Sequence, residues 1–369
     1  MGILDHYKQF EGMSDEDISA DLHADATERR RKALAVIPPL DLSRTTWPEY
    51  PPSTIIDAIT YAARRGLHRY LETAGELRAE LAHRHATEPE RVVVGDGAAQ
   101  LLASAAQTLM TAGDELITPW PSYPLYPVMA RRAGGKAVPV QGFTVDAILA
   151  AVTERTRVVA ICNPNDPTGE LLSVTELRRL LGALPERVVV LLDEALRDFA
   201  DAEPLDAALS LVTGHPRLLV FRSFSKAWGL AGLRCGYVIG GAGSEALLAE
   251  IGPPLGIGEL AQAGVLEALR HGSRKHERRI AQVATQRAAL ISALRERGLD
   301  VSDSQANFLW FALDGVDGAE LSSRFARSGV IVRAGGPLGD PRRVRAAIHG
   351  GEASERFLRA LDLAVSAPA

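Results

Sequence analysis

Residues 223–237 constrain this chain more than any other stretch. They read Ser-Phe-Ser-Lys-Ala-Trp-Gly-Leu-Ala-Gly-Leu-Arg-Cys-Gly-Tyr. The apolar run 218–221 leads into them and predicts a short buried strand. Lys226 would then lie where a buried strand ends, and desolvation lowers the pKa of an amine placed there. Such an amine is partly neutral and can attack a carbonyl group.

Three further side chains of this stretch could bind an anion. Ser223 and Ser225 offer hydroxyl donors and Arg234 offers a forked cation, a set that fits a phosphate. The simpler alternative is a solvated lysine in a glycine-rich loop. The length of the motif makes that alternative weak, and Lys226 alone among the lysines follows an apolar strand into such a motif. The other lysines lie in polar or basic stretches: Lys8, Lys32, Lys136 and Lys275.

The stretch resembles the lysine motif of fold-type I pyridoxal-phosphate enzymes. It is most similar to the histidinol-phosphate aminotransferase branch of the class I and II aminotransferases, and the resemblance extends over roughly residues 40 to 365. It implies that Lys226 holds pyridoxal 5'-phosphate as a Schiff base. Once an incoming amino group has released it, the same lysine would act as the catalytic base.

The composition is typical of a globular protein with two domains. The chain has 369 residues and a mass of 39.5 kDa, enough to bury a large core. A net charge of −5 argues against a nucleic-acid or anionic-membrane partner, and no apolar run approaches the roughly 20 residues of a membrane span. Cys162 and Cys235 lie in apolar surroundings, which favours free thiols in a reducing compartment. The N-terminus lacks the pattern of a signal peptide, so we expect a cytoplasmic protein, and the histidines show no metal-ligand spacing.

Short strands without polar alternation predict an α/β fold. Strands rich in Val, Ile and Leu are expected at 91–94, 115–118, 158–161, 188–192 and 218–221, with further strands at 307–311 and 330–332. Strands buried on both faces form a mainly parallel sheet flanked by helices. We expect an N-terminal arm over 1–50, a large cofactor-binding domain over 51–272 and a small α+β domain over 273–369. A charged helical stretch, 275–297, would connect the domains, and the resemblance implies that both chain ends contribute to the small one.

A candidate phosphate site follows the first of these strands. Residues 95–100 read Gly-Asp-Gly-Ala-Ala-Gln and open a helix. Small residues let backbone N–H groups approach an anion at a helix N-terminus. A lone Gly-x-Gly is usually only a turn, but the strand–loop–helix context favours a site. The resembled family has G-x-G-[SA]-x-[EQ] here, which implies that Ala98 and Ala99 present N–H groups to the cofactor phosphate.

Asp193 ends a fully apolar strand. A carboxylate there is unfavourable unless a cation pairs with it. The pyridinium N–H of the cofactor would be such a partner, and a protonated ring is an effective electron sink. A helix N-cap is the structural alternative. The family-like spacing to Lys226 favours the cofactor interpretation.

The turn at 163–169, Asn-Pro-Asn-Asp-Pro-Thr-Gly, departs from the family pattern N-P-x-N-P-T-G. The second Asn of that pattern binds the phenolic oxygen of the cofactor, and Asp166 stands in its place. The family also has a Tyr three residues after the pyridine aspartate, where this chain has Leu196. Both usual donors to the phenolic oxygen are therefore altered. Our hypothesis is that the imine keeps its proton to higher pH, with Asp166 sharing that proton.

Two tyrosines are assigned from the resemblance. Residues 121–126, Pro-Ser-Tyr-Pro-Leu-Tyr, match the family's P-[ST]-Y-x-x-Y. The match implies that Tyr123 stacks on the pyridine ring, although in isolation Tyr123 and Tyr126 would both be read as core aromatics. Tyr70 would reach the phosphate in the partner subunit's site, which implies a homodimer with shared active sites.

The substrate carboxylate would need an arginine, because a bidentate guanidinium recognises it best. Arg345 matches the family's strand arginine. Arg333 matches an earlier strand-end arginine, which helps to bind the substrate phosphate in histidinol-phosphate enzymes; a surface role is the alternative for each. Asn307 is also family-like, which implies a structural element near the site. Residues 44–48, Arg-Thr-Thr-Trp-Pro, stand where the family often has Asn-Glu-Asn-Pro on an arm that passes the active site.

These features predict a pyridoxal-phosphate-dependent aminotransferase. It would move an amino group between an amino donor, with histidinol phosphate or an aromatic amino acid favoured, and a 2-oxo acid. Two alternatives stay open: a decarboxylase or lyase of the threonine-phosphate decarboxylase type, and a catalytically silent cofactor-binding regulatory protein. Asp166 and Leu196 keep the second alternative open, whereas Lys226 and Asp193 argue against it.

Overall fold

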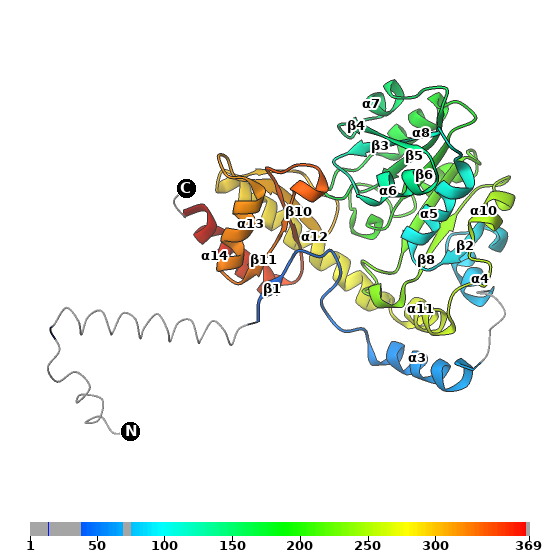
Figure 1. Cartoon of the computed structure of the whole chain (residues 1–369). Helices are drawn as coiled ribbons and strands as arrows, with labels where there is room; N and C mark the ends of the chain where they lie inside the picture. The colour runs from blue at the N-terminus through cyan, green and yellow to red at the C-terminus, as the bar shows by residue number, and fades with distance from the viewer. Residues whose placement is uncertain (1–13, 15–37, 69–74, 367–369) are drawn as a thin grey trace.

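The computed structural model describes residues 14, 38–68 and 75–366. Two β-sheets organise these residues, as Figure 1 shows: a large sheet in cyan to yellow-green and a small one in orange. Most of the predicted arm, residues 1–50, lies outside the described residues, and so does Tyr70. No helix in the described ranges is long and apolar enough to cross a membrane.

The large sheet has seven strands in the order β2-β8-β7-β6-β5-β3-β4. Its neighbouring strands are parallel, except that β8 is antiparallel to both β2 and β7. In chain order they are β2 (Val92–Gly95), β3 (Glu115–Trp120), β4 (Lys136–Gln141), β5 (Thr156–Cys162), β6 (Val189–Asp193), β7 (Leu218–Ser223) and β8 (Gly236–Ile239). The predicted strands and the mostly parallel sheet are confirmed.

Both faces of the large sheet are covered because its strands carry apolar side chains on both. In β5, Val158 and Ala160 face one apolar layer, whereas Val159 and Ile161 face the other. Helices of the first layer are α5 (Ala98–Leu109), α6 (Leu125–Arg132) and α10 (Glu245–Ile251). Helices of the second are α7 (Val145–Ala150), α8 (Val174–Ala183) and α9 (Leu209–Val212). The alternation along one strand thus explains why helices pack on either side.

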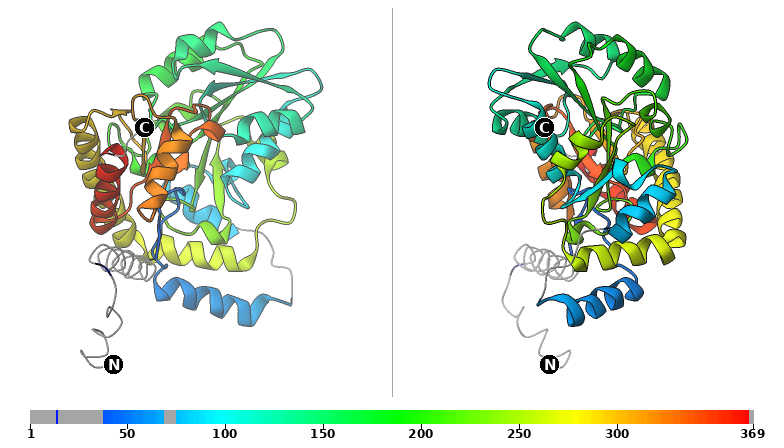
Figure 2. Two further views of the ribbon diagram at one scale, coloured as in Figure 1. Left: turned by 60° about the vertical axis from the view of Figure 1, so that its left-hand side comes forward. Right: turned by 90° about the vertical axis from the view of Figure 1, so that its right-hand side faces the viewer.

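Three more helices close one end of this sheet, beside β2 and β8. They are α3 (Ser53–Gly66), α4 (Gly75–Arg84) and α11 (Glu259–His271). In both views of Figure 2, α3 (blue) lies alongside α11 (yellow-green) at the edge of the molecule. The outer face of α3 therefore has no neighbour within the described part of this chain.

The C-terminal part contains a four-stranded antiparallel sheet in the order β12-β13-β10-β9. Its strands are β9 (Asp300–Val301), β10 (Phe308–Ala312), β12 (Arg333–Ala334) and β13 (Val344–Ala347). The helices packed with it are α12 (Ser273–Glu296), α13 (Gly318–Arg327) and α14 (Gly351–Ser366). The short 3-10 helices of the described chain are η4 (Gly336–Leu338) in this part and, earlier in the chain, η1 (Pro89–Arg91), η2 (Arg197–Phe199) and η3 (Ala231–Leu233). Strand β1 (Leu40–Asp41) pairs in parallel with β11 (Val330–Ile331), so an N-terminal segment joins the C-terminal part.

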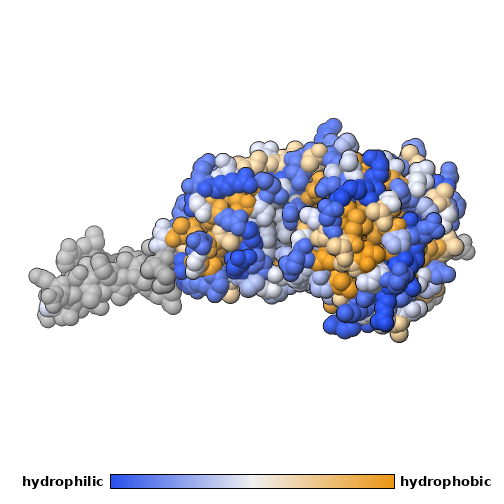
Figure 3. Space-filling view, turned by 90° about the horizontal axis from the view of Figure 1, so that it is seen from above, coloured by the Kyte–Doolittle hydropathy of each residue, from blue (hydrophilic) through white to orange (hydrophobic). Residues whose placement is uncertain are grey.

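The charged helix predicted at 275–297 is α12, and it ties the two parts together. Two of its arginines are buried rather than solvated. Arg279 donates to the carbonyl of Ala227 at 2.5 Å, and Arg287 donates to the carbonyl of Phe199 at 2.8 Å; both carbonyls belong to the large part. Seen from above, the two parts lie side by side, each showing apolar patches (orange) among polar residues (blue) (Figure 3). The domain boundaries themselves stay a prediction.

Candidate active site

Parallel strands of the large sheet present their carboxyl ends at one edge, the usual place for ligands in such sheets. A cavity of about 170 Å³ lies at this edge. The predicted residues that line it are Ala98, Ala99, Tyr123, Asp166, Asp193, Ser223, Ser225, Lys226 and Arg234. Of the other predicted residues, Arg345 contacts Asp166 from the small sheet, Arg333 lies apart and Tyr70 is outside the described residues.

Lys226 follows the last residue of β7 by three positions and projects into the cavity. Its Nζ donates a hydrogen bond to Oγ1 of Thr45, a residue of the N-terminal segment. Burial lowers the pKa of the Lys226 ammonium group, and the carboxylates of Asp166 and Asp193 oppose this effect. The amine therefore loses its proton more easily than a solvated lysine does.

Asp193, the last residue of β6, is buried beside the cavity. Its Oδ2 accepts a hydrogen bond from the hydroxyl of Tyr126 at 3.0 Å, and its Oδ1 accepts one from the amide of Ala195 at 3.0 Å. Burial raises the pKa of this carboxyl to about 6, even though these two bonds act in the opposite direction. A cationic N–H at this point would pair with the carboxylate, so the residue fits a pyridinium ring.

The first turn of α5 forms the other end of the cavity. Strand β8 approaches this turn so closely that a Cβ on Gly236 would lie 2.4 Å from the amide nitrogen of Ala98. Gly97, at the N-cap, has a φ of +88°, which suits glycine. The Nη1 of Arg234 donates to Oγ of Ser225 at 3.3 Å across from these amides. Amide, hydroxyl and guanidinium donors thus converge where a phosphate would fit.

Arg345 and Asp166 form a buried ion pair. Arg345 lies on β13 of the small sheet, and its Nη1 donates to Oδ1 of Asp166 on the turn after β5. Its Nη2 donates to the backbone carbonyl of Ser43 at 3.1 Å. The sequence predicted a role for each residue, but not that one binds the other.

Arg333 does not line the cavity. It lies opposite Arg345 in the antiparallel pairing of β12 with β13, so both side chains leave the same face of the sheet. The Arg333 side chain is exposed, however, and its predicted role in substrate binding stays a prediction.

Sequence reasoning missed the residues that support the predicted ones. Thr45 accepts a hydrogen bond from Lys226, and Thr46 lines the cavity. Asn307, which the sequence did single out, holds this segment: its side-chain amide donates to the carbonyl of Thr45 at 3.0 Å. The departure of residues 44–48 from the family pattern was the available signal. Tyr126, which we considered a core aromatic, is fully buried and also positions Asp193.

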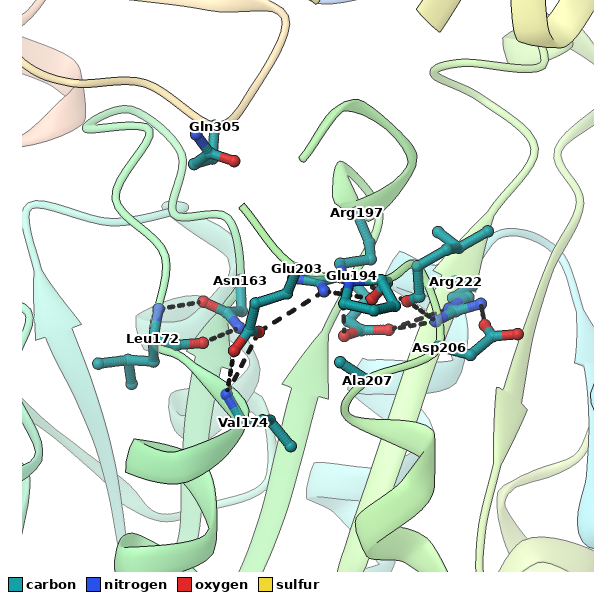
Figure 4. A network of polar contacts seen from close by, with 12 residues as sticks. Asn163, Leu172, Val174, Glu194, Arg197, Glu203, Asp206, Ala207, Arg222 and Gln305 are labelled. Atoms are coloured by element: carbon teal, nitrogen blue, oxygen red, sulfur yellow. Dashed lines mark hydrogen bonds and ion pairs between the residues drawn. The ribbon is translucent and has the colours of Figure 1, made fainter. Parts of the chain in front are cut away.

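A buried polar network starts at Glu194, the residue after Asp193 (Figure 4). Glu194, next to Asp193, pairs with Arg222 of β7 at 2.8 Å, and Arg222 pairs in turn with Asp206 at 2.6 Å. Arg197 lies 4.0 Å from the same glutamate. Because Glu194 directly follows β6 and Arg222 belongs to β7, the network fixes the strand ends that carry Asp193 and Lys226.

The fold and the candidate site together identify the class of protein to which this chain belongs. A mostly parallel seven-stranded sheet, a lysine and a buried aspartate at its carboxyl edge, and a small α+β part are the architecture of fold-type I pyridoxal-phosphate-dependent transferases. The chain belongs to the family of class I and II aminotransferases, which matches residues 40–361. It is an aminotransferase, as the sequence predicted.

Curated relatives agree with this assignment. The chain is 35% identical over 350 residues to the aromatic amino acid aminotransferase of Corynebacterium efficiens, covering 93% of this chain and 98% of that protein. It is 38% identical over 300 residues to the protein of the same name from Mycobacteroides abscessus, covering 79% and 84%.

Solved structures support the fold. The crystal structure of histidinol-phosphate aminotransferase from Sinorhizobium meliloti in complex with pyridoxal-5'-phosphate has a TM-score of 0.78 at 24% identity, covering 88% of this chain and 90% of that one. The aspartate aminotransferase of Thermotoga maritima has a TM-score of 0.77 at 22% identity, covering 95% and 98%. The predicted fold class is confirmed.

Proposed function

We propose that this aminotransferase binds pyridoxal 5'-phosphate through Lys226 and transfers the amino group of an aromatic amino acid to a 2-oxo acid. One observation carries the proposal: an amine of lowered pKa and a buried carboxylate with only neutral hydrogen-bond donors line the same cavity. The names of the curated relatives favour the aromatic donor. Histidinol phosphate is the second donor to test.

The bound cofactor would supply an electron sink for a substrate that has lost a proton from its α-carbon. Asp193 would keep the pyridine nitrogen protonated, and Tyr123 would cover the face of the ring. Lys226 would take the proton from the α-carbon and return it to the cofactor side. Arg345 would bind the substrate carboxylate, and Asp166 lies next to it.

The anionic end of the cofactor would lie at the first turn of α5. Ala98 and Ala99 would offer backbone N–H groups, and the cavity wall opposite them carries hydroxyl and guanidinium donors. These donors are Ser223, Ser225 and Arg234.

We also propose a homodimer in the cytoplasm. Large apolar side chains are exposed on and around α3, whose outer face has no neighbour in the described part of the chain: Tyr50, Ile56, Tyr61 and Leu67. A second copy packed there would remove them from water. Both cysteines are buried free thiols, which suits a reducing compartment.

The test is an absorbance titration of the purified protein with pyridoxal 5'-phosphate and then with phenylalanine, tyrosine, tryptophan, histidinol phosphate and glutamate under single-turnover conditions. We expect a yellow imine band that an aromatic donor converts to the pyridoxamine form. Release of CO2 instead of a 2-oxo acid would indicate a decarboxylase. An absent imine band, or one that persists in Lys226→Ala, would contradict the proposal.

A further inference from the structure

The arginine that suits a substrate carboxylate already holds a carboxylate of this chain. Both side chains of the pair are buried: the exposed fractions are 10% for Arg345 and 9% for Asp166. We propose that Asp166 is an internal competitor for Arg345, which a substrate carboxylate must displace, so that Asp166 determines how tightly the site binds carboxylates. The proposal rests on the proposed function, because it takes Arg345 as the carboxylate site.

Both terminal nitrogens of the Arg345 guanidinium already donate to groups of this chain. Nη1 donates to Asp166 and Nη2 donates to the carbonyl of Ser43 at 3.1 Å. Nε is buried and has no hydrogen-bond partner. A carboxylate binds a guanidinium best through two parallel N–H bonds. Because Nε is buried, we place an incoming carboxylate across the terminal Nη1 and Nη2 nitrogens, where it competes with Asp166 for Nη1.

The displaced carboxylate would remain inside the site. Asp166 acts electrostatically on Lys226, Asp193, Tyr123 and Cys162, in addition to its bond with Arg345. Of these groups only the Lys226 nitrogen can carry a positive charge, so it is the remaining partner for a freed carboxylate. A substrate bound at Arg345 would thus move Asp166 toward the Lys226 nitrogen. The carboxylate would then raise the pKa of the Lys226 ammonium group, against the effect of burial.

The two parts do not depend on this ion pair to stay together. Gly169, three residues after Asp166, packs so closely against the C-terminal part that a Cβ would lie 2.3 Å from Oγ of Ser304. The amide of Gln305 donates to the carbonyl of Gly169 at 2.8 Å. Backbone contacts hold the turn in place, so the pair can open without separating the parts.

The experiment measures the binding of 3-phenylpropionate, an aromatic carboxylate without an amino group, by isothermal titration calorimetry. It compares the parent protein with Asp166→Asn, both loaded with cofactor and both stripped of it. We expect binding to Asp166→Asn to be about tenfold tighter, because Arg345 then carries an uncompensated charge; tenfold corresponds to about 1.4 kcal/mol.

Two controls separate competition from a general charge effect. Glu170→Gln removes an exposed carboxylate from the same turn and should leave the affinity unchanged. The uncharged 3-phenylpropionamide should bind the parent and Asp166→Asn equally. Equal or weaker binding of 3-phenylpropionate to Asp166→Asn would overturn the proposal, even where a normal imine band shows that the cofactor site itself is intact.

A crystal structure of the parent protein with 3-phenylpropionate gives a second readout that does not require the variant to fold. We expect the ligand carboxylate on the Arg345 guanidinium, with Asp166 moved away. A ligand bound while the Arg345–Asp166 pair stays closed would also refute the proposal.

Discussion

Burial of the Asp193 carboxyl lowers the stability of the cofactor-free protein at neutral pH, although the same carboxylate would pair with the cofactor. Its carboxyl has a folded-state pKa of about 6, above the ordinary 3.8, because burial disfavours the ionised form. The stabilising effect of its proton is complete below pH 3.8 and is lost as pH rises through 6. Above pH 6 the cofactor-free protein therefore holds a costly buried charge.

We expect Asp193→Asn to stabilise the cofactor-free protein above pH 6, by up to about 3 kcal/mol. The gain should shrink as pH falls toward 4, and urea unfolding at pH 5 and pH 8 would measure it. The same variant should bind pyridoxal 5'-phosphate at least roughly tenfold more weakly, since the pyridinium loses its counter-ion. Equal stability of the variant and the parent at pH 8 would speak against a buried ionised carboxylate.

Gly236 allows β8 to approach the first turn of α5 closely because it has no side chain. Its Cβ would collide with the backbone amide of Ala98, so Gly236→Ala should push β8 and the first turn of α5 apart. We expect the affinity for inorganic phosphate and for pyridoxal 5'-phosphate to fall about tenfold or more. Gly232→Ala, where no atom lies within 4 Å of the added Cβ, is the matched control. Unchanged affinity in Gly236→Ala would remove α5 from the proposed site.

Some residues of the candidate site could be predicted from the sequence, and others could not. The positions of Lys226, Asp193 and the two alanines of α5 could be predicted because each lies at the end of an apolar strand or within four residues of it, and local pattern reveals strands. The family resemblance then assigned their roles. The pair Asp166–Arg345 and the bond between Thr45 and Lys226 could not. They join residues far apart in the chain, and no periodicity encodes such contacts.

At the level of elements, a buried ionic network holds the ends of β6 and β7 together. Glu194 is fully buried between two arginines, so Glu194→Ala would leave Arg222 with less compensation for its charge. We expect the free energy of unfolding to fall by about 3 kcal/mol or more, measured by urea denaturation. Glu186→Ala, at an exposed site before β6, should change it by less than about 0.5 kcal/mol. A loss in Glu194→Ala no larger than in this control would mean that the network adds little.

Among the elements, the strands of the large sheet were easier to predict than the ends of the chain. Fully apolar runs mark β5, β6 and β7, and the observed bounds differ from the predicted ones by no more than two residues. Helix α12 was predicted from its charge, yet Arg279 and Arg287 turn inward to bind backbone carbonyls. A charged side chain can be buried when its donors are satisfied, and sequence does not show which carbonyls are available.

For the whole molecule, the exposed apolar side chains around α3 carry the prediction of a dimer. Ile56, on α3, is 47% exposed, and Ile56→Glu should weaken self-association at least about tenfold, as measured by sedimentation velocity. Leu363→Glu places the same charge on α14, at a side chain that is 60% exposed, and should leave the association unchanged. A parent protein that sediments as a monomer at micromolar concentration would contradict the dimer, although it would leave the assignment to the aminotransferase family untouched.

The residues proposed to hold the cofactor and the arginine proposed to bind the substrate carboxylate come from widely separated parts of the chain. Every described cofactor-side residue of the cavity, from Ala98 to Arg234, precedes residue 240, whereas Arg345 comes within the last 25 residues of the chain. A chain released early, without β13, would keep the lysine and the aspartate but lack the cation for a substrate carboxylate. Premature termination near residue 340 would thus remove the proposed substrate cation together with β13 and α14, which belong to the C-terminal core, while every described cofactor-side residue would still be in the chain.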